Sequence, residues 1–227
     1  MSYEVLFDGL TRAGPGDAES LGWAVGRAGV PERAAILDAG CGMGADLGAL
    51  AALRPGARIV AVDLMETFVA RVREVHPGIE VVCADMTDPP GGPFDFIWSA
   101  GAAYAPGVAA CLAAWRGHLA PGGAVAFSDL CWRVAEPSAA ARDFWAAEGL
   151  EMRNAEGLEA VVTAAGYRVE AARWLEPGAW AAYYEPVARR LAALPEDDFT
   201  RAFAAEIALW RAHGGDYDYR LIVARPA

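Results

Sequence analysis

Three glycines follow an apolar run in the segment "ILDAGCGMGADLGAL", residues 36–50, and a helix-like pattern comes after them. Glycine has no Cβ, so a chain rich in it can turn tightly and lie against a ligand, while the N-terminus of the following helix offers free N–H groups. This order predicts a nucleotide-binding loop. Gly40, Gly42 and Ala45 also match the G-x-G-x-x-G/A pattern of NAD-binding proteins, so the loop alone does not name the cofactor.

Acidic residues in the same region indicate which cofactor the loop would take. Asp38 lies two positions before the first glycine, where it would face a cationic amino group but would be ill placed beside a pyrophosphate. Asp63 ends the next apolar run and could accept hydrogen bonds from two ribose hydroxyls. Asp85, in "VVCADM", could accept from an adenine amine, with the backbone of Met86 available to the neighbouring ring nitrogen. Together they favour a cofactor that carries an amino acid.

The elements that must position these residues follow an alternating pattern. From Ala34 to Arg173 short apolar runs alternate with amphipathic stretches, which is typical of a parallel sheet covered by helices. We expect helices over about 44–53 and 66–75, and strands at 35–39, 58–63, 79–83, 94–99, 124–129 and 167–174. The run "DYDYRLIVAR", residues 216–225, predicts a late antiparallel strand. Residues 1–30 and about 176–213 stand outside the alternation, and we expect them to form a helical cap over the substrate site of a single domain, 1–227.

Composition excludes several classes of function. Thirty acidic and nineteen basic residues give a net charge of −11, which disfavours a nucleic-acid partner. All nineteen basic residues are arginine, so a Walker A loop, a Schiff-base lysine and a Tyr/Lys dehydrogenase dyad are ruled out. The four cysteines form no CxxC pair and are expected to be reduced thiols, with no metal site. The sequence predicts neither a membrane span nor a targeting segment, so we expect a cytoplasmic protein with no membrane partner.

The motifs occur in an order that resembles the class I S-adenosylmethionine-dependent methyltransferases. That family carries an acidic-x-G-x-G-x-G loop, an acid that ends the second strand, adenine-contacting residues after the third strand, and a PGG turn before the fifth, here Pro121 to Gly123. The resemblance implies a Rossmann-like α/β fold. Its sheet would have seven strands, mostly parallel, in the order 3-2-1-4-5-7-6, with an antiparallel last strand and helices on both faces.

The resemblance also implies S-adenosyl-L-methionine as cofactor, S-adenosyl-L-homocysteine as product, and no required metal. It assigns the glycine loop to the methionine part of the cofactor, Asp63 to the ribose, and Asp85 with Met86 to the adenine. The complete set of expected cofactor contacts is Asp38, Gly40, Cys41, Gly42, Gly44, Asp63, Leu64, Asp85, Met86 and Ser99.

Further segments look like a bacterial subgroup of small-molecule methyltransferases. They are "RAGPG" at 12–16, "WSAGAAY" at 98–104, "SDLCWRVAEP" at 128–137, "DFW" at 143–145, "WAAYYEP" at 180–186 and the terminal "DYDYRLIVAR". The subgroup commonly has a glutamate where this chain has Ala100. The similarity implies a small-molecule acceptor without naming it.

Methyl transfer from a sulfonium is an in-line displacement, for which an enzyme mainly aligns the reactants and excludes water. One proton acceptor near the methyl group would help the reaction. The candidate catalytic residues are Tyr104, just after the fourth predicted strand, and Asp129, at the end of the fifth, because these strand ends lie at the ligand edge of the sheet. An aromatic group could form a substrate cage, although aromatics at this helical spacing also suit a buried helix face. The expected substrate contacts are Tyr104, Trp132, Trp180, Tyr183 and Tyr184.

Two other functions stay open at this point. The G-x-G-x-x-A match permits an NAD-dependent Rossmann oxidoreductase, and Ala100 leaves room for a non-catalytic cofactor-binding protein. A homodimer is expected only because homodimers are the commonest oligomers.

Overall fold

An eight-stranded mixed sheet lies at the centre of the computed structural model, which describes residues 2–227 apart from the side chain of Glu4. Seven strands run in the order β3-β2-β1-β4-β5-β8-β7, and β6 pairs with β5 off this path. The strands are β1 (Ala35–Ala39), β2 (Arg58–Asp63), β3 (Glu80–Cys83), β4 (Phe94–Ala100), β5 (Leu119–Trp132), β6 (Arg153–Asn154), β7 (Tyr167–Trp174) and β8 (Tyr217–Pro226). Only β8 runs antiparallel to its two neighbours, β5 and β7, among the strand pairs of the described chain.

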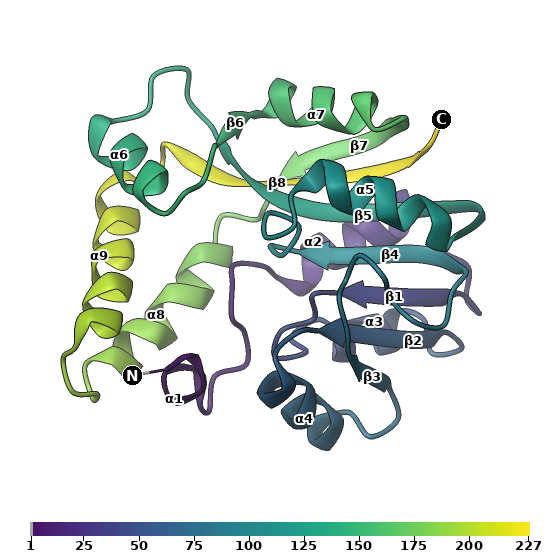
Figure 1. The fold of residues 1–227 in the computed structure, drawn as a ribbon, viewed down its shortest axis with the longest axis horizontal. Coiled ribbons are helices and arrows are strands. Elements are labelled where there is room, and N and C mark those ends of the chain that lie inside the picture. The colour runs from purple at the N-terminus through teal and green to yellow at the C-terminus, as the bar shows by residue number, and fades with distance from the viewer. Residues whose placement is uncertain (1) are drawn as a thin grey trace.

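Helices cover both faces of this sheet (Figure 1). They are α1 (Tyr3–Phe7), α2 (Ala18–Arg27), α3 (Leu47–Leu53), α4 (Glu66–Val75), α5 (Val108–Trp115), α6 (Ala139–Ala147), α7 (Ala155–Ala164), α8 (Ala179–Leu191) and α9 (Asp198–His213). The apolar sides of α2, α3 and α4 pack on one face of the sheet, and those of α5 and α7 on the other.

Side chains that point alternately to the two faces of the central strands form these two apolar layers. In β1, Ile36 belongs to the core cluster under α2 and α3, whereas Leu37 belongs to the cluster under α5 and α7. Successive strand side chains point to opposite faces, and both faces are covered, so the central strands read as nearly continuous apolar runs. This burial leaves the carboxyl ends of the strands as the place where polar side chains can gather.

Helices α1, α8 and α9 lie beyond those carboxyl ends, and we call this group of helices the cap (Figure 1). Helices α1, α8 and α9 pack against one another in a separate apolar cluster that includes Phe7, Tyr184 and Phe203. Helix α2 instead packs against α3 and β8, so within the expected cap segment 1–30 only the part before α2 joins this cluster. Met1 lies outside the described residues.

The predicted sheet order is confirmed, with eight strands where seven were expected. The difference is β6, a two-residue strand that pairs Arg153 with Cys131 of β5 and is too short to give a periodic pattern. Strand β5 is longer than the predicted 124–129 at both ends, because Leu119 pairs with Phe94 of β4 and pairing with β8 extends the strand to Trp132. Helix α3 begins at Leu47 rather than near Gly44, whose φ of +76° is incompatible with a right-handed helix.

Candidate active site

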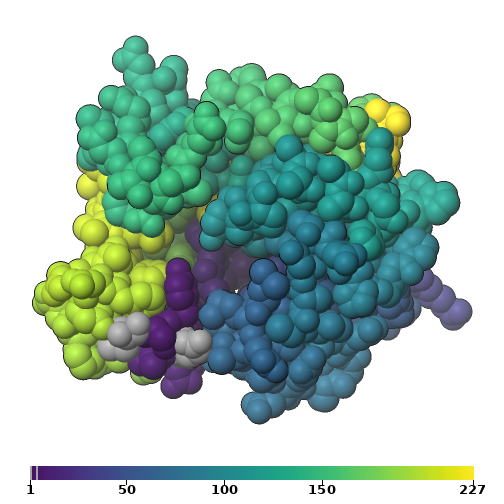
Figure 2. Space-filling view, viewed as in Figure 1, coloured from purple at the N-terminus to yellow at the C-terminus, as the bar shows by residue number. Residues whose placement is uncertain are grey.

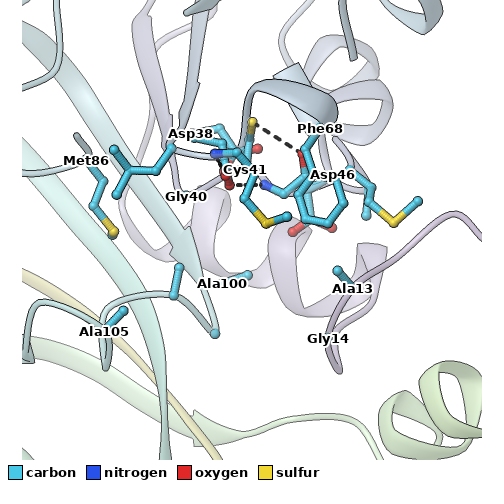
Figure 3. Close-up of a pocket in the computed structure, with 18 of the residues that line it drawn as sticks. Ala13, Gly14, Asp38, Gly40, Cys41, Asp46, Phe68, Met86, Ala100 and Ala105 are labelled. Atoms are coloured by element: carbon cyan, nitrogen blue, oxygen red, sulfur yellow. Dashed lines mark hydrogen bonds between the residues drawn. The ribbon is translucent and has the colours of Figure 1, made fainter. Parts of the chain in front are cut away.

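A cavity of about 620 Å³ lies where β1, β2, β3 and β4 end. Its wall combines the glycine loop after β1 with the residues that follow the other three strands, and the segment Arg12–Pro15 closes it from the N-terminal side. Figure 3 shows Asp38, Gly40 and Cys41 on one side of this cavity, with Met86 and Ala100 on another. The chain reverses its direction of winding between β1 and β4, and open α/β sheets bind ligands at such a point.

The glycine loop is shaped by close contacts that a side chain would prevent. Gly40 has a φ of +77°, and a Cβ at this position would lie 2.5 Å from the Cβ of Ala102. The backbone N–H groups of Gly40 and Cys41 both donate to the carbonyl of Val62, at 2.9 Å each. The loop is thereby folded back over the end of β2 while its other edge faces the cavity.

Negative charge is concentrated in the same cavity. Asp38 is 3% exposed, and burial together with the neighbouring carboxylates of Asp46 and Asp63 raises its pKa well above the ordinary value, while Arg12 acts in the opposite direction. A cation placed among these carboxylates would be stabilised by them, and an anion such as a pyrophosphate would be repelled. The site therefore suits a ligand with a positively charged group.

Asp63 is oriented by two backbone donors. Its carboxylate accepts hydrogen bonds from the N–H of Gly42 at 2.8 Å and from the N–H of Met65 at 2.9 Å. Because a carboxylate has about four acceptor sites, it keeps further capacity for ligand hydroxyls. Asp63 thus couples the glycine loop to the end of β2 and lines the cavity at the same time.

Asp85 and Met86 line the cavity after β3. Asp85 accepts hydrogen bonds from the N–H and the hydroxyl of Thr87, at 2.8 and 2.7 Å, and these bonds lower its pKa. The carbonyl of Met86 accepts from the indole of Trp115 at 2.8 Å, which fixes the backbone at this point. Asp85 therefore stabilises its own turn and also borders the cavity.

Sequence reasoning missed two residues of this site, Arg12 and Asp46. The guanidinium of Arg12 lies 2.5 Å from the carboxylate of Asp46, which also accepts a hydrogen bond from the indole of Trp98 at 2.9 Å. This ion pair ties the N-terminal segment to the end of the glycine loop. The "RAGPG" segment contains Arg12, but no spacing rule connects it with a residue 34 positions away.

A second cavity of about 420 Å³ adjoins the first. The two share wall residues from the N-terminal segment and from the loop after β4, among them Gly101 and Tyr104. The rest of the second wall comes from the end of β5, the α6–β6 connection, the cap helices α8 and α9, and β8. In the space-filling view a hollow opens between the purple N-terminal segment and the blue and teal residues (Figure 2).

Both candidate catalytic residues border this second cavity. Asp129 lies in β5 and is 8% exposed, and burial raises its pKa to about 6, against the effects of the Leu130 backbone and Arg153. Tyr104 lines both cavities and is 51% exposed. The phenol pKa of Tyr104 is raised by burial and by the carboxylates of Glu206 and Asp129.

Of the expected substrate contacts other than Tyr104, three line the second cavity as well, namely Trp180, Tyr183 and Tyr184. The hydroxyl of Tyr184 donates to Glu206 at 2.5 Å, and the ring of Trp180 stacks on that of Tyr219 with 5.5 Å between centroids. Tyr183 and Tyr184 also belong to the buried face of α8, whereas Trp180 is half-buried, and a role of these rings as a substrate cage stays a prediction.

Three expected contacts lie elsewhere, since the walls that the described residues form around the two cavities include neither Ser99, Gly44 nor Trp132. Ser99 is fully buried within β4. A Cβ at Gly44 would meet Leu47 and Val72 at 3.1 Å, so this glycine allows close packing of α3 and α4. Trp132 packs edge-on against Tyr217. The remaining expected cofactor residues, including Cys41 and Leu64, line the first cavity.

Within residues 2–227 no group of three or more His, Cys, Asp or Glu side chains is arranged to hold a metal ion. None of the helices in this range combines the length and the apolar character required to cross a bilayer.

Comparison with known proteins agrees with this geometry. Residues 36–123 match the model of a methyltransferase domain family, and no curated protein matches the chain in sequence. A SAM-dependent methyltransferase from Geobacter sulfurreducens, solved with S-adenosyl-L-homocysteine, is 19% identical with a TM-score of 0.80, and the match covers 99% of this chain and 97% of that one.

Two other solved structures are similar over most of their length. A SAM-dependent methyltransferase from Thiobacillus denitrificans, also in complex with S-adenosyl-L-homocysteine, is 18% identical with a TM-score of 0.80, over 99% of this chain and 98% of that one. Geranyl diphosphate C-methyltransferase from Streptomyces coelicolor is 19% identical with a TM-score of 0.66, over 92% and 77%. Residues 36–123 therefore match a methyltransferase domain family, and the chain as a whole has the fold of solved S-adenosylmethionine-dependent methyltransferases.

Proposed function

We propose that the chain binds S-adenosylmethionine in the first cavity and transfers its methyl group to a small-molecule acceptor held in the second. The observation that carries this proposal is the shared wall of the two cavities, at Gly101 and Tyr104, next to a cluster of buried carboxylates. The similar segments noted in the sequence favour the bacterial small-molecule subgroup.

The residues of the first cavity fit this cofactor. Asp38 would hold the cationic amino group, for which its burial beside Asp46 and Asp63 is suited. Asp63 would accept from the ribose hydroxyls, and Asp85 with the backbone of Met86 would contact the adenine. When bound, the cofactor would supply a methyl group on a positively charged sulfur, so that a nucleophile attacking the methyl carbon displaces a neutral thioether.

The chain itself would contribute alignment, exclusion of water and a proton acceptor. The cap helices α8 and α9 cover the second cavity and would keep water from the reacting atoms. Asp129 would accept the proton that an amine, hydroxyl or thiol loses, and Tyr104 would orient the acceptor between the two cavities. A carboxylate with a pKa of about 6 is ionised, and therefore basic, at neutral pH.

The test is turnover with cofactor that carries an isotopically labelled methyl group. The purified protein is incubated with panels of amines, thiols, phenols and alcohols, and mass spectrometry follows label in the acceptor and formation of S-adenosylhomocysteine. Labelled methyl in an acceptor supports the proposal, and the Asp38→Asn variant should show no such transfer. Micromolar cofactor affinity without transfer to any acceptor would instead favour a non-catalytic cofactor-binding protein.

A further inference from the structure

The second cavity has two carboxylates in its inner wall. Asp129 is 8% exposed, and Glu206 of α9 is half-buried with its pKa raised by burial. The other charged side chains that line the cavity, Glu148, Glu151 and Arg153, are exposed. Charges in contact with bulk water interact several-fold more weakly than buried ones, so the inner carboxylates dominate the potential inside the cavity.

Both inner carboxylates act on the same pair of phenols. The pKa of Tyr219 is raised by burial, by Tyr104, and then by Asp129 and Glu206. Tyr104 responds to the same two carboxylates and borders the first cavity as well. Asp129, Glu206, Tyr104 and Tyr219 all line the second cavity, so the two carboxylates border a common space, and Tyr104 belongs to the wall that the two cavities share.

Glu206 is held in place by the cap. Its Oε1 accepts a hydrogen bond from the hydroxyl of Tyr184 at 2.5 Å, which lowers its pKa and opposes the effect of burial. This contact fixes the carboxylate against α8 at the wall of the cavity. A carboxylate kept in such a position attracts a cation and repels an anion.

Aromatic rings make up much of the remaining wall. Trp180 lies 5.5 Å from Tyr184 and 5.5 Å from Tyr219, and Tyr183 lies 4.8 Å from Tyr184, measured between ring centroids. Aromatic faces carry partial negative charge and attract cations, and they also accept apolar groups. Rings and carboxylates thus select the same chemistry, an apolar body that carries a positive charge.

We infer that the acceptor is a small organic amine with an apolar body, which Glu206, Asp129 and the aromatic wall recognise in its cationic form. This inference rests on the proposed function, because it assigns the second cavity to the acceptor. It excludes acceptors whose group next to the methyl donor is a carboxylate or a phosphate. Such anions would meet two inner carboxylates, with only the exposed Arg153 as a basic lining residue among the described residues.

The reaction step balances with these groups. The ammonium first loses one proton to Asp129, and from there to water, which leaves a nitrogen lone pair. That lone pair forms the N–C bond with the methyl group while the C–S bond breaks and its electron pair stays on sulfur. For a primary amine the product is a methylated ammonium, which carries the charge that the sulfonium has lost.

Matched ligands of one shape test the inference by binding rather than by turnover. Phenylpropylamine, phenylpropanol and phenylpropanoate, with the corresponding hexyl series, are titrated calorimetrically into protein saturated with S-adenosylhomocysteine. We expect at least one of the two amines to bind about tenfold more tightly than its alcohol and its carboxylate, a difference of about 1.4 kcal/mol. The inference would be overturned if, in both series, the alcohol or the carboxylate bound as tightly as the amine, or if neither amine bound.

Variants identify the residues involved. Glu206→Gln keeps an oxygen for Tyr184 but removes the charge, and we expect it to weaken amine binding about tenfold, with unchanged affinity for S-adenosylhomocysteine. Glu185→Gln is the matched control, since Glu185 lies on α8, pairs with Arg211 on the exposed side and lines neither cavity. Equal amine affinity in Glu206→Gln and Glu185→Gln would overturn the inference. If the wild-type protein does not bind S-adenosylhomocysteine at all, the proposed function fails, whatever the amine affinities are.

Discussion

Replacement of Asp63 by alanine is expected to weaken the binding of S-adenosylhomocysteine, because Asp63 would accept charge-assisted hydrogen bonds from the two ribose hydroxyls. Bonds of this type contribute about 1–3 kcal/mol in total once competition by water is included. This range corresponds to a rise in Kd of roughly 5- to 150-fold. Calorimetric titration of the wild-type protein and the variant, at the same pH and salt concentration, measures it.

The structure adds a second effect that must be separated from the first. Asp63 also accepts from the N–H groups of Gly42 and Met65, at 2.8 and 2.9 Å, so its loss loosens the glycine loop. Asp63→Asn retains one side-chain acceptor without the charge, and we expect it to bind with an affinity between those of the wild type and Asp63→Ala. Urea unfolding of each variant shows how much of the change belongs to stability.

Asp88→Ala is the matched control. The Asp88 side chain is 94% exposed, it lies in the loop after β3, and it lines neither cavity. We expect no change in Kd for this variant. If Asp63→Ala binds S-adenosylhomocysteine as tightly as Asp88→Ala does, the placement of the ribose at the end of β2 is refuted.

Three further predictions concern stability, measured by urea unfolding. Gly40→Ala should lose about 1–3 kcal/mol more than Gly9→Ala, because both glycines have φ near +78° but only a Cβ at Gly40 meets a neighbour, and equal losses would contradict this. Arg12→Ala should cost about 3 kcal/mol, since it leaves Asp46 buried without its guanidinium partner, and added Asp46→Asn should recover part of that loss; strictly additive effects would rule out the pair. Burial raises the pKa of Asp129 to about 6 from 3.8, so the folded state binds more protons than the unfolded state and stability falls as pH rises through this window. Asp129→Asn should therefore gain up to about 3 kcal/mol relative to the wild type between pH 4 and 7, and a pH-independent difference would contradict the shift.

Much of the fold could be predicted because its pattern is local. The runs at Ala35–Ala39 and Arg58–Asp63 are mostly apolar and bounded by turns, and the structure has strands with these same bounds. The sheet order followed from the resemblance to a known family rather than from any periodicity. The short β6 and the full length of β5 were not predictable, because both depend on pairing with distant residues.

In the candidate site too, some residues could be predicted from a local pattern and others depend on how distant segments pack. Asp38, Asp63 and Asp85 are recognisable because each lies at or just after the carboxyl end of an apolar strand, and all three line the first cavity. The contact of Arg12 with Asp46, and the arrangement of Glu206 against Tyr184, depend on how the N-terminal segment and the cap fold over the sheet. Ser99 shows the opposite case, because a motif position that suggested a ligand contact is filled by a fully buried side chain.

The most direct test of the central claim is calorimetric titration of the wild-type protein with S-adenosylhomocysteine, with NADH in a parallel cell. Saturable binding of S-adenosylhomocysteine and none of NADH is expected, because the carboxylates of Asp38, Asp46 and Asp63 favour a cationic amino group and oppose a pyrophosphate. Binding of NADH alone would mean that the glycine loop serves a dinucleotide, and it would contradict the assignment of both cavities.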